Sequence, residues 1–510
     1  MGNNKVAVLS VSAIVLVAVV ATVAVTVSNR YSQPEKTEFS TSNKNIKDFC
    51  RPTDYQATCE SSLSEVADNT TDPKELVNLA FQVTIDHIKK AFDHSTVLSE
   101  AAKDSRTSDA LENCRELLDY AIDDLKSSID RLDGFSLTKL DKFLDDLKVW
   151  ISATITYQET CLDGFENTTT DAAESMRKAL NSSAELTSNI LAIVINFDSA
   201  LDSLNLGFNR KLLSEEYPSW ISPGKRRLLQ QSPAELKPNV TVAKDGSGDV
   251  KTIGEAVLRV NRSLANVMMI GDGTSKTKIT GKLNYIDGTA TFKTATVAIV
   301  GDGFIGKDLW IENSAGAAKH QAVALRVQSD KSVFYNVRMD GYQDTLYVHT
   351  KRQFYRECTI SGTQNIVTAQ GRKDRRQASA IILHNCTISA DPAYFPARKK
   401  LPTFLGRPWK EFSRTFVLQS QLDDLIDPKG WLPWSGDFGL NSCFYTELDN
   451  RGPGADMSQR VKWKGVKAID YAHAQKFTVE HFIQGNAWLP KTGVPFIPGL
   501  LPMTESGRIH

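Results

Sequence analysis

The chain has 510 residues, more than one hydrophobic core usually serves, so we expect two domains joined by a linker. Lysine and arginine together number 60, as do aspartate and glutamate, so the formal net charge is zero. This balance gives no reason to expect a nucleic acid as partner, because phosphate binding needs an excess of cations.

The N-terminus carries a membrane-targeting signal. Residues 6–27 form a run of 22 residues without a charge, with Lys5 before it and Arg30 after it. A helix needs roughly 20 apolar residues to cross a bilayer, so residues 1–30 are interpreted as a signal anchor that contacts the membrane. A long cleaved signal peptide is the alternative. Both interpretations send the chain into the secretory pathway.

Six asparagines stand in the sequon Asn-X-Ser/Thr, the acceptor motif for N-glycans. One sequon arises easily by chance, but six on a chain with a targeting signal predict a glycoprotein. They are Asn69, Asn167, Asn181, Asn239, Asn261 and Asn385.

Four of the seven cysteines lie in the first third of the chain. In an oxidising compartment they predict two disulfides, for which sequence alone allows three connectivities. We favour Cys50 with Cys59, because nine residues close easily, and Cys114 with Cys161, because that bond would tie two helices. Free buried thiols are the alternative. A zinc site is disfavoured, because no histidine stands at ligand spacing from these cysteines.

Residues 31–205 have the pattern of helices. Asp72 and Pro73 suit a helix start, and apolar side chains then recur three or four residues apart. The spacing returns in three later segments, so we predict an all-α four-helix bundle without catalytic residues. The stripe positions include Phe81, Ile85, Ile88 and Phe92, then Leu111, Cys114, Leu118, Ala121 and Leu125, then Leu147, Ile151 and Thr154.

Residues 206–235 interrupt the helical pattern with several prolines and two basic clusters. The clusters are Arg210-Lys211 and Lys225-Arg226-Arg227. An exposed basic linker in a secreted protein predicts cleavage by a processing protease. A solvated linker that is never cut is the alternative.

Residues 236–510 change to a strand pattern. FIGKDLWIENS, FYNVRMDG, FYRECTISG and ILHNCTISA each alternate apolar residues and end in a turn residue. Aligned on Leu309, Val337, Cys358 and Cys386, these segments recur every 21 to 28 residues. Short strands at this spacing predict a solenoid of parallel sheets. A β-sandwich is the alternative, but its hairpin turns are not evident.

Several longer motifs carry a family resemblance. They are KHQAVALRV (319–327), GYQDTLYVH (341–349), TAQGR (368–372), LGRPWKE (405–411), DDLIDPKGWLPW (423–434) and FIQGNAWLP (482–490). With them the second half resembles plant pectin methylesterases. YQETCLDGF (157–165) resembles the inhibitor domain that many of these enzymes carry as a pro-region, and YPSWISPGKRRLLQ resembles their processing linker.

The resemblance implies a right-handed parallel β-helix that hydrolyses the methyl esters of homogalacturonan to pectate and methanol in the cell wall. It implies a pair of aspartates and neither metal nor cofactor. One aspartate attacks the ester carbonyl, while the other protonates the departing methanol and then activates water. It also implies a contact, within or between chains, of the inhibitor domain with an esterase.

The family's functional residues fall on six positions of this chain. Asp344 corresponds to the family's proton donor. Gln321 and Gln343 correspond to residues that contact the oxyanion and the substrate, and their neutral side-chain amides are suited to donate hydrogen bonds to an oxyanion. Arg407 corresponds to an arginine that orients the nucleophile, and Trp409 corresponds to a tryptophan whose ring stacks on a sugar ring. Thr291 is a further substrate contact. Each alone has a structural explanation, such as a turn carboxylate or a packed ring.

The nucleophilic aspartate has no counterpart. Family members continue Gly-Thr with a DFIFG motif and another coil before TAQGR, whereas here Gly362-Thr363 leads through Gln364-Asn365-Ile366-Val367 straight to Thr368. About one coil is therefore missing. A further strand with a GxYxE motif is missing after residue 260. We expect lower stability, and Cys358, without its family partner, to pair with Cys386.

Three hypotheses follow for function. The chain is a pectinesterase by family whose activity as written is in doubt, a catalytically silent pectin-binding protein, or an inhibitor of other esterases. Asp340, Glu357 and Asp374 are other carboxylates near the motif, but nothing in the sequence aims them at the scissile bond. A displacement of about one ångström can cost roughly 100-fold in rate.

Overall fold

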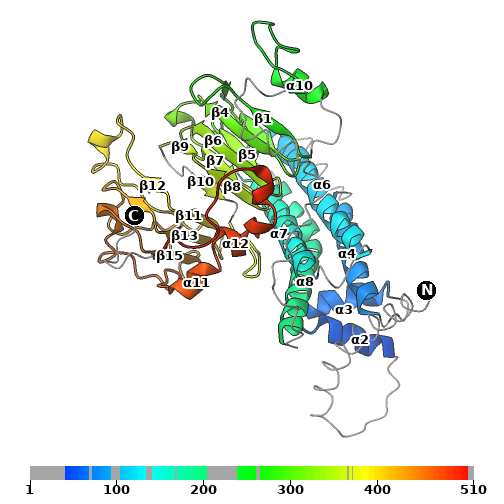
Figure 1. Cartoon of the computed structure of the whole chain (residues 1–510). Coiled ribbons are helices and arrows are strands. Elements are labelled where there is room, and N and C mark those ends of the chain that lie inside the picture. The colour runs from blue at the N-terminus through cyan, green and yellow to red at the C-terminus, as the bar shows by residue number, and fades with distance from the viewer. Residues whose placement is uncertain are drawn as a thin grey trace, which may run out of the picture. The chain divides into compact units, whose positions relative to one another are not determined.

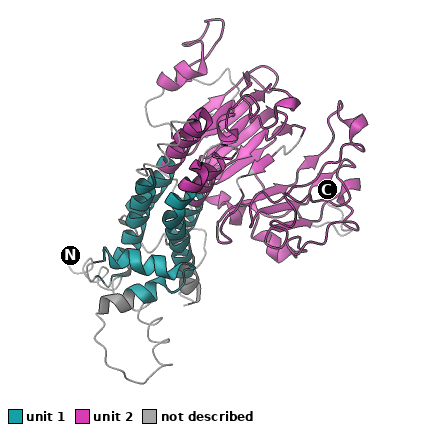
Figure 2. Ribbon diagram, turned by 180° about the vertical axis from the view of Figure 1, so that it is seen from behind, with its two compact units in different colours: residues 1–94, 119–154, 176–213 teal, residues 95–118, 155–175, 214–510 magenta. Residues whose placement is uncertain are grey.

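The computed structural model describes residues 41–502 apart from 68–69, 71, 93–103, 134–139, 167, 169–170, 204–237, 260–264, 364–366 and 370. The predicted signal anchor and processing linker both lie outside these residues. Figure 2 shows two compact units, unit 1 with residues 1–94, 119–154 and 176–213, and unit 2 with residues 95–118, 155–175 and 214–510. No helix among the described residues has the length and hydropathy needed to span a membrane.

The N-terminal region is helical, as predicted. Its helices are α2 (Thr41–Cys50), α3 (Gln56–Ser64), α4 (Pro73–Phe92), α6 (Ser105–Asp133), α7 (Leu140–Asp163) and α8 (Ala172–Ser203) (Figure 1). The start of α4 is capped by Asp72, whose carboxylate accepts a hydrogen bond from the Lys74 amide at 2.9 Å. Phe81, Ile85 and Ile88 are buried, so the apolar spacing did identify the inner face of α4.

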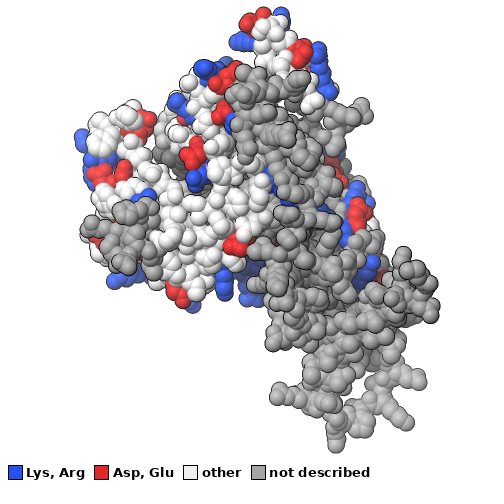
Figure 3. Space-filling model, viewed as in Figure 1, with Lys and Arg blue, Asp and Glu red and all other residues white. Residues whose placement is uncertain are grey.

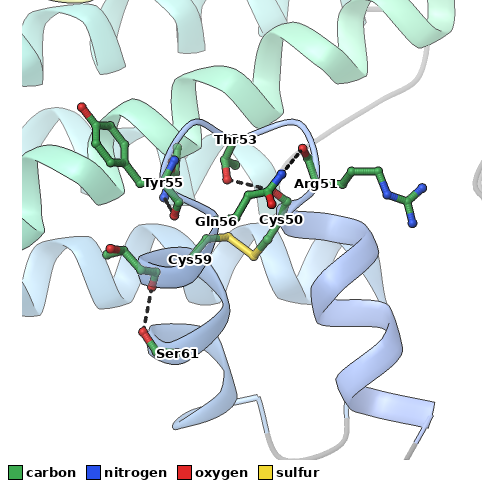
Figure 4. The surroundings of a disulfide bond; sticks show 9 residues. Cys50, Arg51, Thr53, Tyr55, Gln56, Cys59 and Ser61 are labelled. Carbon is green, nitrogen blue, oxygen red and sulfur yellow. Dashed lines mark hydrogen bonds between the residues drawn. A yellow bond between two sulfur atoms is a disulfide. The ribbon is translucent and has the colours of Figure 1, made fainter.

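Both predicted disulfides are present. Cys50 is bonded to Cys59, and Cys114 is bonded to Cys161. The first bond joins the end of α2 to α3 across a short turn (Figure 4), in which the Thr53 hydroxyl donates to the Cys50 carbonyl at 2.7 Å. The second joins α6 to α7 within unit 2. A covalent link of this kind stabilises the fold mainly by restricting the unfolded chain.

Parallel strands build the rest of unit 2. The first sheet has the order β1 (Met268–Ile270), β4 (Ile305–Asn313), β6 (Ser332–Asp340), β8 (Gln353–Arg356), with β2 (Lys278–Gly281) on β4 and β9 (Thr359–Ser361) on β6. The second sheet has the order β10 (Val367–Ala369), β7 (Leu346–Val348), β5 (Leu325–Val327), β3 (Val297–Ile299). The others are β11 (Ile381–His384), β13 (Arg414–Leu418), β15 (Phe444–Leu448), and β12 (Thr387–Ile388) with β14 (Gln421–Leu422). Every pair of these strands is parallel, as in a solenoid.

A left-handed corner residue marks each repeat. Leu309, Val337, Cys358 and Cys386, the positions on which the sequence repeats align, each directly follow a residue with φ between 52° and 55°. The corner residues are Asp308, Asn336, Glu357 and Asn385. Asparagine and aspartate tolerate this conformation better than most residues. The Asn336 side chain also donates to the Asp308 carboxylate of the preceding coil at 2.5 Å.

Replacing Asn336 by alanine is expected to lower the urea midpoint of unit 2, at a cost of about 2 kcal/mol, because it loses this hydrogen bond and strains the corner. Asn336→Gly loses the same bond but accepts a positive φ, so it should cost about 1 kcal/mol less. Equilibrium urea unfolding followed by circular dichroism measures both. A glycine variant less stable than the alanine variant would contradict the role assigned to the corner.

Buried aliphatic side chains fill the interior of the coils, including Leu309, Leu325, Val337 and Leu346. The C-terminal segment lies against the outer faces of the sheets. There, α11 (Tyr471–Gln475) places Ala474 against Phe416 of β13. After α12 (Val479–Phe482), Trp488 packs on Ile305 of β4. On the face drawn in Figure 3, acidic and basic side chains of the described residues are interspersed.

The expected disulfide between Cys358 and Cys386 is wrong, because both thiols are free. The Cys358 Sγ atom points to the carbonyls of Phe334 and Arg356, each at 3.4 Å. The Cys386 Sγ atom faces the carbonyl of His384 at 3.6 Å. Burial raises the pKa of Cys358 to about 11, which disfavours the thiolate needed for disulfide exchange.

Candidate functional site

Asp344 stands two residues before β7 in a left-handed conformation, with φ of 61°. Its side chain is only 6% exposed. The Oδ1 atom accepts a hydrogen bond from the Thr368 hydroxyl of β10 at 2.8 Å. The strand beside β7 therefore presents a neutral hydroxyl to the predicted proton donor.

The two predicted glutamines lie on neighbouring coils. Gln321 and Gln343 form a parallel β-bridge, in which the Ala322 amide donates to the Gln343 carbonyl at 3.1 Å. The Oε1 atom of Gln321 is buried without a hydrogen-bond partner among the described residues. Buried polar atoms nearly always have partners, so this side chain fits a position that completes its hydrogen bonds with a ligand.

Arg407 is close enough to Asp344 for their charges to interact. Burial lowers the pKa of Arg407, while the negative charge of Asp344 opposes this shift. The loop that carries Arg407 is held by backbone hydrogen bonds from Leu405 to Gly430 at 2.8 Å and from Leu432 to Gly406 at 3.0 Å. These two hydrogen bonds hold residues 405–406 against residues 430–432, which follow later in the chain.

Trp409 belongs to an aromatic pair. Its ring meets that of Trp434 edge to face, with centroids 4.5 Å apart, and the Arg407 guanidinium lies 4.6 Å from the Trp434 centroid. Aromatic faces beside a guanidinium suit a sugar ring that bears a carboxylate. Trp434, which is 37% exposed, was not singled out from the sequence, although it ends the GWLPW stretch of a family motif.

Thr291 begins a short 3₁₀ helix, Thr291–Lys293, and is half-buried. Its neighbour Phe292 lies beneath the Arg326 guanidinium at 3.5 Å and meets the ring of His349 at 5.3 Å. His349 follows β7 on the same coil as Asp344. Thr291 is thus linked to that coil through its neighbour Phe292.

The C-terminal end of α7 contacts this part of unit 2. The Lys410 ammonium, next to Trp409, lies 2.6 Å from an Asp163 carboxylate oxygen and 3.3 Å from one of Glu159. Burial lowers the pKa of Lys410, but these two carboxylates outweigh that effect and raise it. Thr160 is hydrogen-bonded to the His349 ring at 2.9 Å.

The resemblance implies a contact of the inhibitor domain with an esterase, but the residues of α7 that make these contacts were not predicted, because each contact joins residues more than 180 positions apart. The sequence indicates Thr368 only as the first residue of the TAQGR motif. Its hydrogen bond to Asp344 depends on which strand pairs with β7, and that pairing is not visible in composition or spacing.

Comparisons with known proteins agree with the motifs. The family described as Pectinesterase matches residues 258–366 and 362–486, and that described as Plant invertase/pectin methylesterase inhibitor matches residues 44–193. The Arabidopsis thaliana protein named Putative pectinesterase/pectinesterase inhibitor 28 is 44% identical over 550 positions, which cover 98% of this chain and 75% of the relative.

Two further known proteins are matched over almost their whole length. Probable pectinesterase/pectinesterase inhibitor 58 of Arabidopsis thaliana is 43% identical, covering 94% of this chain and 96% of the relative. The solved pectin methylesterase from carrot is 42% identical with a TM-score of 0.51, covering 52% of this chain and 99% of that structure. The parallel coils of unit 2 thus have the fold of pectin methylesterases, and the chain belongs to the plant pectinesterase family, with the N-terminal inhibitor domain that accompanies it in these relatives.

Proposed function

We propose that this chain binds methyl-esterified homogalacturonan as its family's substrate but hydrolyses the ester poorly, because it has a proton donor and no nucleophile. The observation that carries the proposal is the direct pairing of β10 with β7, which sets Thr368 beside Asp344. The Thr368 hydroxyl donates to the Asp344 carboxylate, which is assigned as the proton donor, so this hydroxyl does not replace a second, ionised carboxylate as nucleophile. Gln321, Gln343, Thr291, Arg407 and Trp409 remain as substrate contacts.

The loss of about one coil is supported by the matched ranges. The Pectinesterase match is divided into two segments that meet and overlap at residues 362–366, which is where the coil is proposed to be missing. The alignment to inhibitor 28 spans 550 positions, whereas the whole chain has 510 residues. At least 40 positions of that alignment therefore have no residue here.

Sheet topology gives a second line of support for a lost coil. Among the described strands, β8 pairs with β6 alone, and β11 pairs with β13 alone. The first sheet ends at β8 and the second ends at β10. These two strands lie on the same coil, because each is 21 positions on from its partner in β6 or β7, and β11 begins a separate sheet. Removing one coil from a right-handed β-helix would leave such a break in both sheets, because the coils on either side then meet across a new interface. The second proposed loss, after residue 260, falls outside the described residues.

Sequencing the transcript across the codons for residues 240–380 tests the missing segments first. A longer product that encodes GxYxE and DFIFG would show that the natural protein has both aspartates, and the proposal of poor hydrolysis would fail. A product of the length printed here should encode a protein whose methanol release from pectin stays at background.

Binding is tested separately from hydrolysis. Trp409→Ala and Arg407→Ala are each expected to weaken retention on methyl-esterified homogalacturonan about 10-fold, which corresponds to about 1.4 kcal/mol. Affinity electrophoresis in gels that contain the polymer measures this. Lys464→Ala, which removes an exposed cation near the last strand, is the matched control and should leave retention unchanged. Equal retention of all variants would contradict a site at Arg407 and Trp409.

A second candidate function is inhibition of an esterase by residues 31–205, interpreted as a four-helix bundle. The contacts of Asp163 and Glu159 with Lys410 favour it, because they engage a cation beside the predicted substrate contacts. The full chain added to an active esterase of the family should reduce methanol release. Asp163→Ala should weaken that inhibition, whereas Asp130→Ala, which removes an exposed carboxylate of α6, should not.

The targeting signals extend the proposal to location. We infer that the chain is a glycoprotein delivered through the secretory pathway to the cell wall and held at the membrane by residues 1–30 until a protease cuts the linker. The cleavage sites proposed are Arg210-Lys211 and Arg226-Arg227. Terminal sequencing of the protein recovered from cell walls tests this order of events, and a mature N-terminus before residue 206 would exclude cleavage in the linker.

A further inference from the structure

One of the six sequons occupies a special position in the solenoid. Asn385 is a corner residue between β11 and β12, with φ of 53°. The side chains of Asn385 and Thr387 are both exposed, so the two polar groups of this sequon face solvent. The Asn385 backbone is fixed by a hydrogen bond from its amide to the Leu418 carbonyl at 3.1 Å.

The corner asparagines differ in what their side chains do. Asn336 donates its amide to Asp308 of the neighbouring coil, which uses the group that a glycan would occupy. The Asn385 side chain makes no hydrogen bond to any residue that the structure describes. Modification at Asn385 would therefore cost the folded protein no described contact.

The other sequons are less suited or lie outside the described residues. Asn181 is exposed on α8, but its amide donates to Glu185 at 3.0 Å, and the Ser183 hydroxyl of the same sequon is buried. Asn239 is exposed, and Thr241 of its sequon is hydrogen-bonded to Asp249 at 2.6 Å. Asn69, Asn167 and Asn261 lie outside the described residues.

The two strands beside Asn385 are both edge strands. In the sheet β11-β13-β15, β11 is a terminal strand, and β12 has β14 as its one partner among the described strands. Unpaired backbone groups on an edge strand can pair with another chain, and proteins protect such edges by covering them. A bulky, hydrated glycan at the corner between these two edges would be well placed to block that association.

We propose that Asn385 carries an N-glycan that shields the edge strands β11 and β12 from pairing with other chains. Glycan transfer forms a bond between Asn385 Nδ2 and C1 of the oligosaccharide. It breaks the bond between C1 and a lipid pyrophosphate donor, which leaves with its oxygen, and the amide loses one proton. The proposal rests on entry into the secretory pathway, as proposed above.

The full chain, secreted from plant cells, is digested with peptide N-glycosidase in heavy-oxygen water and mapped by mass spectrometry. The expected result is an Asn385 peptide that carries the glycan and yields a heavy-oxygen aspartate after digestion. A chain modified at Asn239 and unmodified at Asn385 would overturn the assignment while supporting secretion. A chain without any glycan would overturn both the assignment and the proposed secretory route.

Thr387→Ala tests the shielding role, because it removes the sequon and keeps Asn385 at its left-handed corner. This variant should lose one glycan from its intact mass and shift from monomer toward aggregate in light scattering. Ser183→Ala, which removes the Asn181 sequon, is the matched control and should not cause that shift. If Thr387→Ala loses the glycan and stays as monomeric as the parent chain, the shielding role is wrong.

Discussion

Replacing Asn365 by aspartate is expected to raise methanol release from methyl-esterified homogalacturonan about 10-fold or more above the unchanged chain. The pairing of β7 with β10 relates residues 21 positions apart, as in Leu346 with Val367. The same offset leads from Asp344 to Asn365, which itself lies outside the described residues. A carboxylate one repeat from Asp344 would supply the missing nucleophile, and Asp344 would protonate the departing methanol.

The gain should remain far below the rate of a complete relative, because a carboxylate displaced by about one ångström can lose roughly 100-fold. Asn365→Ser introduces a side chain without a charge and is the matched control. The double variant Asn365→Asp with Asp344→Asn should return to background. Activity that survives loss of Asp344 would contradict the assignment of Asp344 as the proton donor, and no gain in the single variant would contradict the placement of residue 365 one repeat from Asp344.

The repeats could be predicted from the sequence because each one depends on local preferences. Alternating apolar residues fill the coil interior, and an asparagine or aspartate, which tolerates a left-handed backbone, stands before three of the four aligned positions, as at Asp308 and Asn336. The helical stripe through Cys114 likewise identified a buried face. The same short-range reasoning did not predict the C-terminal cover, since Trp488 meets Ile305 from far along the chain.

Some contacts of the candidate site could likewise be predicted from the sequence, and others could not. Asp344 and Gln343 are neighbours in one motif, and their placement beside Gln321 follows from the stacking of coils. The pairing of Trp409 with Trp434 joins loops of different coils, which no period in the sequence relates. The expected bond between Cys358 and Cys386 failed for a related reason, because repeat spacing predicts which positions correspond but not where each thiol points.

Replacing Arg352 by alanine is expected to destabilise unit 2 by about 3–5 kcal/mol, because it leaves a buried carboxylate without its partner. Arg352 bonds Asp330 of the preceding coil through two nitrogens, at 2.9 Å and 2.5 Å, and both side chains are no more than 5% exposed. It also donates to Gln484 of the C-terminal segment at 3.0 Å. One side chain thus joins two coils to the segment that covers them.

Lys373→Ala is the matched control, because it breaks an exposed pair with Glu411 and should cost no more than about 1 kcal/mol. Urea unfolding measures both variants. Replacing Asp330 and Arg352 together by leucine and methionine should be milder than Arg352→Ala, since no charge is then left buried. Similar losses in the Lys373 and Arg352 variants would show that the buried pair has no special role in stability.

The same pair should govern stability in acid. Burial alone would raise the pKa of Asp330, but the charge and hydrogen bonds of Arg352 outweigh it and hold the pKa well below its usual range. Folded Asp330 therefore binds fewer protons than unfolded Asp330, so its contribution is complete above about pH 4 and declines as the pH falls further. Arg352→Ala should lose most of this acid-dependent decline, whereas Lys373→Ala should retain it. A variant without Arg352 that unfolds with the parent's pH profile would mean that other carboxylates set the acid limit.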